Sequence, residues 1–261
     1  MQDQMTNEKR PGRWSWLVFC VLVTGLLQGL WDSPIHANPQ SSAEIETGQP
    51  ESATAEATAA AALPERTLLN VPLISQLPEL YNGCEVTSLA MLVNVAGHPV
   101  DKLELARNIR KDPAREQTNA QGQTLAWGNP NTGFVGDVTG ASRGYSVNHG
   151  PIAELLSRYL PNRVVDLTGH SFDELLNSVA GGKPVVVWTT ENFGPTDDWV
   201  TWKSPSGDVR ATFSEHCVLL VGYDATTVTV NDPLDNRQKQ VNRENFVQSW
   251  EQLGKQAVTY Q

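Results

Sequence analysis

The sequence predicts an α+β fold with a largely antiparallel sheet. Between about residues 84 and 181 the apolar residues recur at helical spacing, whereas short β-branched runs dominate from residue 184 onward. Helices followed by strands are typical of α+β domains, while regular alternation of the two would indicate a parallel sheet. About residues 65–261 have the length and composition of one folded domain with its own core.

Four helices are expected before the strands. The first begins at Cys84, with Asn82 as the expected N-cap and Glu85 completing a capping box, and it ends at Gly97. The other helices carry similar start and stop signals, and a fifth, amphipathic helix follows the strands. The second helix is expected to start at a capping box of Asp101 and Glu104 and to end before Pro113, and the third to start at Pro151. The fourth is expected to start at a capping box of Ser171 and Glu174 and to end at Gly181-Gly182, and the fifth to span about residues 243–253.

Four strands are expected in the second half of the domain, at residues 184–190, 216–223, 226–231 and 256–260. A tight turn at Tyr223-Asp224-Ala225-Thr226 joins the second and third strands into a hairpin. A hairpin centred near residue 224 places His216 and Asp232 at facing cross-strand positions. The sequence therefore predicts that an imidazole and a carboxylate meet at the open end of this hairpin.

The N-terminal residues 1–37 have the layout of an export signal. A basic flank at residues 9–13 precedes an apolar stretch at 14–31, and Ala37 offers a small residue for cleavage. The stretch also approaches the length of a membrane anchor, so cleavage and anchoring both stay open. In either case we expect the domain outside the cytoplasm, because the basic flank stays inside. Residues 38–64, rich in Ala, Thr, Ser and Glu, are expected to form a disordered linker.

Charge and motif content argue against several classes of partner. The formal net charge of −10 is unfavourable for binding nucleic acid or an anionic membrane surface. The sequence has no CxxC, no HExxH and no other tight His/Cys cluster, so we expect neither a metal site nor a cofactor. The sequence gives no indication of an oligomeric state.

Cys84 is the candidate nucleophile. At the start of a helix its sulfur lies among unpaired backbone N–H groups and at the positive end of the helix dipole, which favours the thiolate. We therefore expect iodoacetamide to label Cys84 well before Cys217 near pH ~6. Two alternatives stay open, a packing residue and a disulfide with Cys217. Strand alternation argues against the disulfide, because Cys217 points away if His216 faces Cys84.

His216 and Asp232 are the candidates for the base and its orienting acid. Asp232 can accept a hydrogen bond from one ring nitrogen and so fix the tautomer, while the other nitrogen faces the thiol. Taken alone, His216 is typical of a satisfied strand histidine and Asp232 of a turn residue before Pro233. The order Cys, His, Asp along the chain is nevertheless the layout of a cysteine hydrolase.

Several phrases of the sequence occur in the order found in a known family. They are Val71-Pro72, Gln76, Asn82-Gly83-Cys84-Glu85, Glu215-His216-Cys217-Val218, Gly222-Tyr223-Asp224 and Asn231-Asp232-Pro233-Leu234. From about Val71 to the last residue the chain thereby resembles the bacterial cysteine peptidases related to the bacteriocin-leader-processing (double-glycine) family, within the papain clan.

This resemblance implies a papain-like cysteine peptidase fold, in which the nucleophile helix packs on the sheet. It also implies Cys84 as nucleophile, His216 as general base and acid, and Asp232 as the partner that orients His216. The resemblance further implies that Gln76 donates a hydrogen bond to the oxyanion. Gln76 lies eight positions before Cys84, a longer gap than in the leader-processing members.

The expected activity is hydrolysis of peptide bonds in a protein or peptide substrate through a thioester acyl-enzyme. Two other classes stay open: a transglutaminase-like acyltransferase with the same triad, and a catalytically silent module that binds a component of the cell envelope. The glycine-rich stretch 128–137 and the aromatic residues Trp188, Trp199 and Trp202 are candidates either for lining a substrate groove or for ordinary packing.

Overall fold

The structure, a computed structural model, describes residues 63–261. The expected export segment, residues 1–37, lies outside this part, as does the expected linker up to residue 62. Among the helices of the described part, none combines the length and the apolar character that a bilayer crossing needs.

Residues 63–261 form five helices and thirteen strands. The helices are α1 (Cys84–Val95), α2 (Lys102–Asn108), α3 (His149–Tyr159), α4 (Phe172–Ala180) and α5 (Arg243–Gln252). The strands of the main sheet are β1 (Thr67–Leu68), β6 (Val164–Asp166), β7 (Val185–Thr190), β10 (Glu215–Tyr223), β11 (Thr227–Asp232), β12 (Arg237–Asn242) and β13 (Ala257–Tyr260). The remaining strands are β2 (Lys111–Asp112), β3 (Gln117–Thr118), β4 (Thr124–Ala126), β5 (Phe134–Val135), β8 (Val200–Ser204) and β9 (Gly207–Ala211).

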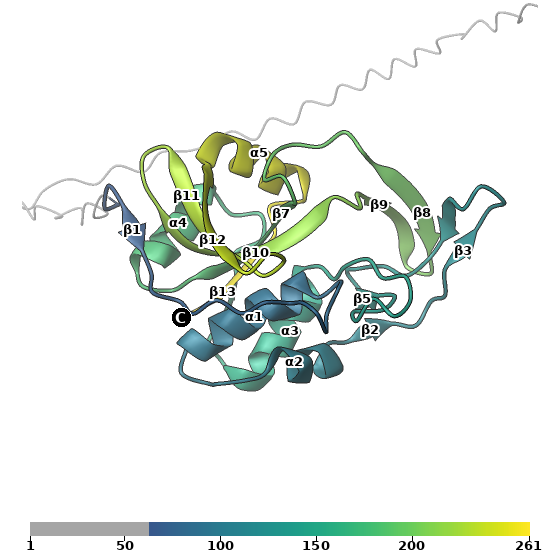
Figure 1. The fold of residues 1–261 in the computed structure, drawn as a ribbon, viewed down its shortest axis with the longest axis horizontal. Coiled ribbons are helices and arrows are strands. Elements are labelled where there is room, and N and C mark those ends of the chain that lie inside the picture. Colours follow the sequence, from purple (N-terminus) through teal and green to yellow (C-terminus); the bar gives the residue numbers. More distant parts are fainter. Residues whose placement is uncertain (1–62) are drawn as a thin grey trace, which may run out of the picture. The chain divides into compact units, whose positions relative to one another are not determined.

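The main sheet has the strand order β12-β11-β10-β7-β13-β6, with β1 paired to β10. All of its neighbouring strands run antiparallel. Figure 1 shows α1, α2 and α3 grouped on one side of this sheet, with α5 on the other side. The predicted α+β class with a mainly antiparallel sheet is therefore confirmed.

Two apolar cores lie on the two faces of the main sheet. One core includes Leu89 of α1 and the other includes Trp250 of α5. Strand β10 contributes to both, because successive side chains of a strand point to opposite faces. Cys217 and Leu219 belong to the core of α1, whereas Val218 belongs to the core of α4 and α5.

The helix starts agree with their signals only in part. At α4 the capping box of Ser171 and Glu174 is present, as expected. At α2 the side chain of Asp101 caps the first turn, also as expected. Glu104 forms no capping box there, because its carboxylate accepts a hydrogen bond of 2.9 Å from the hydroxyl of Tyr159 on α3. Tertiary contact thus competes with a local capping interaction at this position.

Strands β10 and β11 form the expected hairpin, but the predicted register is wrong. Leu219 faces Asn231, so Asp232 lies opposite Val218 rather than opposite His216. Beside the turn the pairing is displaced by three residues, because Tyr223 faces Val228, and a bulge between Leu220 and Gly222 reduces this displacement to two. Because the offset between Val218 and His216 is two residues, His216 and Asp232 still share one face of the sheet.

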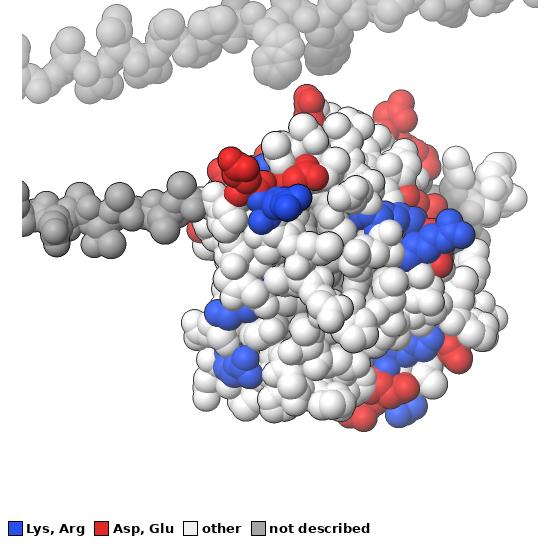
Figure 2. Space-filling view, turned by 60° about the vertical axis from the view of Figure 1, so that its left-hand side comes forward, with Lys and Arg blue, Asp and Glu red and all other residues white. Residues whose placement is uncertain are grey.

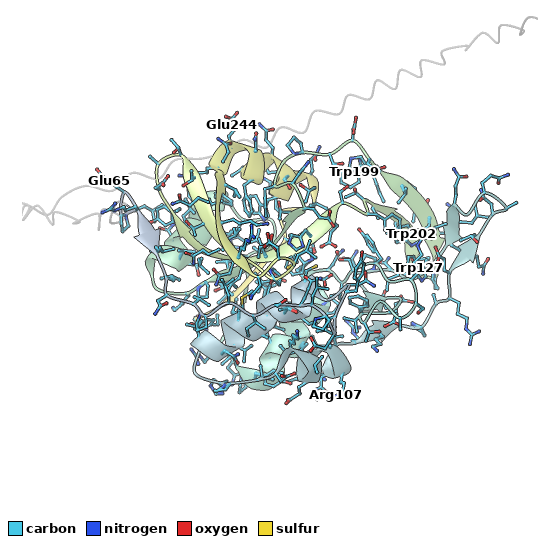
Figure 3. All side chains as sticks on the ribbon, in the orientation of Figure 1. Glu65, Arg107, Trp127, Trp199, Trp202 and Glu244 are labelled. Carbon is cyan, nitrogen blue, oxygen red and sulfur yellow. The ribbon has the colours of Figure 1, made fainter. Side chains whose placement is uncertain are left out.

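The sequence did not predict β12 or the smaller sheet of order β3-β4-β8-β9. Strand β12 is polar and largely exposed at the edge of the main sheet, so it lacks an apolar pattern of period two. The smaller sheet encloses a third core around Trp127 and Trp202, whose ring centroids lie 6.0 Å apart. Figure 3 shows these two residues close together beside β8.

Charged side chains of both signs lie near one another on the surface. On the face in Figure 2, acidic and basic residues form mixed groups around a largely uncharged centre. Lys102 with Glu79 and Arg143 with Glu116 are examples of such local pairing. In each of these pairs one partner is largely buried and the other is exposed. Fully exposed pairs are typically worth at most about 1 kcal/mol each, so the apolar cores dominate stability.

Removal of β13 is expected to abolish the cooperative unfolding transition. This strand lies inside the main sheet between β7 and β6, and all of Ala257–Tyr260 is buried. A chain ending at Lys255 loses the ladder hydrogen bonds to both neighbours and leaves gaps in both cores. Thermal unfolding followed by circular dichroism tests this, with a chain lacking only Gln261 as the control. A cooperative transition in the shortened chain would contradict the expectation.

Candidate active site

Cys84 is the first residue of α1, but the expected capping box is absent. Gly83 occupies the N-cap position without a side-chain hydrogen bond, and the Asn82 amide instead donates to the Asp137 carbonyl at 2.7 Å. A Cβ at residue 83 would lie 2.6 Å from the Cβ of Leu80, so this close turn requires glycine. The sequence correctly predicts where the helix starts, whereas the capping groups were assigned wrongly.

The Cys84 thiol lies among carboxyl groups. Its Sγ donates to Glu85 Oε2 at 3.5 Å, and the other oxygen of Glu85 accepts a 2.8 Å hydrogen bond from the Val147 N–H. One carboxylate oxygen of Glu85, one of Glu215 and the Cys84 Sγ all lie within 4.8 Å of one another. Glu85 is fully buried, which is unusual for a carboxyl group without a cationic partner.

This environment overturns the expected low pKa of the nucleophile. Burial raises the pKa of the Cys84 thiol well above its ordinary value, and the carboxyl groups of Glu85 and Glu215 raise it further. Burial likewise raises the pKa of Glu85 and, together with the charge of Glu85, that of Glu215. In this conformation the thiol is protonated at neutral pH, because desolvation outweighs the helix N-terminus.

His216 and Asp232 meet as the sequence predicts. His216 Nε2 lies 2.8 Å from Asp232 Oδ1, and both side chains are almost completely buried. The other oxygen of Asp232 accepts a 2.7 Å hydrogen bond from Lys239 Nζ on β12. Burial alone would raise the pKa of Asp232, but the hydrogen bond and charge of His216 and the hydrogen bond of Lys239 hold it well below its ordinary value. The carboxylate is therefore ionised throughout the neutral range.

The nucleophile and the histidine belong to different cores. Cys84 packs with Cys217 in the core of α1, whereas the His216 ring lies 6.4 Å from the ring of Phe193, which belongs to the opposite core. The thiol of Cys84 is hydrogen-bonded to Glu85, whereas the imidazole of His216 is hydrogen-bonded to Asp232. The expected condition that His216 faces Cys84 is therefore not met, and Cys217 lies on the side of Cys84 instead. Both cysteines are nevertheless free thiols, so they form no disulfide.

Gln76 lies next to the loop that follows Asp232. Its backbone N–H donates to the Pro233 carbonyl at 2.9 Å, and its side-chain amide donates to the Tyr81 carbonyl at 2.9 Å. The side chain is buried, and its Oε1 has no hydrogen-bond partner among residues 63–261. Gln76 is thus held between the loop before α1 and the end of β11.

Three further residues surround these groups, and the sequence predicts none of them as a site residue. The sequence predicts Glu85 as a capping residue, and Glu215 stands out in it only as the neighbour of His216. Lys239 lies on β12, a polar strand without a recognisable pattern. The combination of an acidic residue directly after the cysteine and another directly before the histidine was the available signal for the first two.

A cavity of about 260 Å³ opens beside Glu215. Asn129, Tyr145 and Trp199 are among its lining residues, so part of the predicted groove borders it. Trp188 and Trp202 do not line this cavity. Their indole N–H groups are buried and donate to the carbonyls of Val147 and Gly128, at 3.0 Å and 2.8 Å, which are packing roles. Figure 3 shows Trp199 at some distance from Trp202.

The fold and comparisons with known proteins indicate a cysteine peptidase of the C39-like class. The model of the Peptidase_C39 like family matches residues 68–258. YvpB of Bacillus subtilis (strain 168), a protein of uncharacterized function, is 42% identical over 195 residues, which cover 74% of this chain and 75% of YvpB. The chain belongs to the Peptidase_C39 like family.

A solved structure shares the same architecture. It is a crystal structure of a Bacillus anthracis protein assigned to the C39-like peptidases, with 48% sequence identity. The similarity covers 76% of this chain and 98% of that one, with a TM-score of 0.69. Family membership and fold together support a cysteine peptidase.

The substitution Glu85→Gln is expected to make Cys84 more reactive. The amide retains an oxygen for the Val147 N–H, while its NH₂ replaces a carboxyl oxygen beside the sulfur and can donate to a thiolate. A hydrogen bond of about 1 kcal/mol would accelerate alkylation near neutral pH about fivefold and shift its pH profile downward. The pH dependence of iodoacetamide labelling, followed at Cys84 by peptide mass spectrometry, measures this effect.

Glu191→Gln is the matched control for this substitution. Glu191 is exposed and is absent from the groups that act on the Cys84 thiol. An unchanged profile in Glu85→Gln, or an equal shift in the control, would show that Glu85 does not govern the thiol.

Proposed function

We propose that this protein is an exported cysteine peptidase that hydrolyses peptide bonds through Cys84, His216 and Asp232. The buried hydrogen bond between His216 Nε2 and Asp232 Oδ1, in a chain of this family, is the observation that carries the proposal. The carboxylate holds one ring nitrogen, so Nδ1 is the nitrogen that exchanges a proton with the thiol. The substrate is a protein or a peptide.

Catalysis begins when the thiol leaves Glu85. The proposal requires a conformation in which the sulfur has left the two carboxyl groups and lies within reach of His216, which then takes its proton. The thiolate attacks the carbonyl carbon of the scissile bond, His216 protonates the leaving amine, and a thioester remains. His216 then activates the water that hydrolyses this acyl-enzyme.

Two groups bind the oxyanion in this proposal. One is the backbone N–H of Cys84 at the start of α1, where N–H groups have no partner within the helix. The other is the side-chain amide of Gln76, which uses one N–H for the Tyr81 carbonyl and retains a second donor. Gln76→Ala should therefore lower kcat more than it raises KM.

Export is the second component of the proposal. The basic flank and the apolar stretch within residues 1–37 support it, and they leave both a cleaved signal and a retained anchor compatible with the same active domain.

Mapping of new protein N-termini tests the proposed function. Extracytoplasmic proteins from cells with wild-type protein are compared with those from cells with Cys84→Ala. N-termini that depend on Cys84 support a peptidase, whereas their absence contradicts it. Adding an amine acceptor separates the classes further: incorporation of the amine into product would indicate acyl transfer, and no reaction of Cys84 with electrophilic peptides would indicate a binding module.

A further inference from the structure

Beyond the hydrolysis of peptide bonds, we infer that the active site can bind a divalent cation such as Zn²⁺ or Co²⁺. The ligands would be Cys84 Sγ, one carboxylate oxygen of Glu85 and one of Glu215. These three side chains come from the start of α1 and the start of β10. The site includes the nucleophile itself, so an ion bound there prevents nucleophilic attack.

The spacing of the three side chains suits such an ion. Their potential ligand atoms lie within 4.8 Å of one another, and the sulfur is 3.5 Å from Glu85 Oε2. Zinc holds sulfur at about 2.3 Å and carboxylate oxygen at about 2.0–2.2 Å. Small side-chain rotations are therefore enough for the three atoms to share one ion.

Unpartnered polar atoms provide a second, independent observation. Glu215 Oε1 and Ser146 Oγ are both buried, and neither has a hydrogen-bond partner within the described part of the chain. The Ser146 hydroxyl faces the carboxyl groups of both Glu85 and Glu215. Burying polar groups without partners is costly, and a cation coordinated by the two carboxylates removes part of that cost.

The neighbouring cavity gives the ion a route to the site. Glu215 borders the cavity of about 260 Å³, and its carboxylate belongs to the same cluster as Cys84 and Glu85. The side toward the cavity is therefore the position at which a fourth ligand completes a tetrahedron.

The ligand set also selects the kind of cation. Mg²⁺ and Ca²⁺ prefer oxygen ligands, whereas a thiolate favours softer ions such as Zn²⁺ and Co²⁺. On binding, the S–H bond is replaced by a sulfur–metal bond, and the displaced protons pass to solvent. His216 is not needed as a ligand, because its Nε2 is held by Asp232. Inhibition of peptidase activity by the ion rests on the proposed function. Binding of the ion to these three side chains does not depend on that function.

Cobalt absorption tests the site without any assay of peptidase activity. Full-length protein in a phosphine reductant is titrated with Co²⁺, and a sulfur-to-cobalt charge-transfer band in the near ultraviolet is expected. Cys84→Ser should abolish the band. Glu215→Gln should weaken binding at least about tenfold, since even groups outside the ligand set commonly change metal affinity 10- to 100-fold.

Glu191→Gln is the matched control, because Glu191 acts on Glu215 through its charge but is no ligand. Its affinity for Co²⁺ should change far less than that of Glu215→Gln. The absence of a band, a band that survives Cys84→Ser, or equal affinity in Glu215→Gln would overturn the site.

Alkylation gives a second readout for the native ion. Zn²⁺ should protect Cys84 from iodoacetamide, and a chelator should restore labelling, both measured by mass spectrometry of the Cys84 peptide. Labelling that Zn²⁺ leaves unchanged would also overturn the inference. A cobalt band and zinc protection in a protein that cleaves no peptide would refute the proposed function while the cation site stands.

Discussion

Cys84→Ala is expected to lower kcat/KM by about 10⁴-fold or more, because the variant retains no group that can form the acyl-enzyme. The fold should persist, because Cys84 is the first residue of α1, its side chain is 8% exposed, and the change removes only one sulfur atom. The measurement is the rate of cleavage of a peptide identified by N-terminal mapping, together with the unfolding temperature of both proteins.

Cys217→Ala is the control for this prediction. Cys217 is a free thiol in the same core and is completely buried, so its loss tests the general effect of removing a cysteine there. This variant should retain its turnover with at most a modest loss of stability. Equal losses of activity in both variants at unchanged stability, or full activity in Cys84→Ala, would refute the assignment of the nucleophile.

Asp232→Asn is expected to lower kcat by about 10²- to 10⁴-fold, because an amide can present its NH₂ to His216 Nε2 and so favour the wrong tautomer. The neutral amide also stabilises the imidazolium less than the carboxylate does. The chain should still fold, because Asn and Asp have nearly the same size.

Asp235→Asn is the matched control for Asp232→Asn. Lys239 Nζ lies 2.9 Å from a carboxylate oxygen of Asp235 and 2.7 Å from one of Asp232. Of these two carboxylates, Asp232 alone contacts His216. Asp235→Asn should therefore retain its kcat. A loss in both variants would assign the effect to Lys239, and full activity of Asp232→Asn would remove Asp232 from the triad.

The same contact should make stability depend on pH. The pKa of Asp232 lies below its ordinary value in the folded protein, so the folded state binds this proton less readily than the unfolded state. The contribution of Asp232 is therefore fully present above about pH 4 and is lost as the pH falls below that value. The difference in unfolding free energy between wild type and Asp232→Asn should shrink between neutral pH and pH ~3.

Local patterns were sufficient for the five helices and for four strands of the main sheet. The apolar periodicity predicted α1, and the β-branched runs predicted β7 and β10, because these segments face a core along their whole length. Strand β12 and the small sheet escaped prediction, because edge and polar strands are held by their neighbours rather than by their own pattern. The register of the hairpin also depended on a bulge that no local signal marked.

The sequence by itself determined the class of the fold, the position of Cys84 at a helix start and the two strands that carry His216 and Asp232. These features follow from periodicities of 3.6 and 2, which residue order encodes, whereas the even offset that puts the two side chains on one face depends on the bulge in β10. Only the tertiary structure decided the environment of the thiol. Glu85 and Glu215 reach the sulfur from segments about 130 residues apart. The burial of Cys84 and the charges of these two glutamates raise the pKa of the thiol, which the helix start alone would lower. Desolvation depends on everything that packs around a group, and that packing is a property of the folded chain.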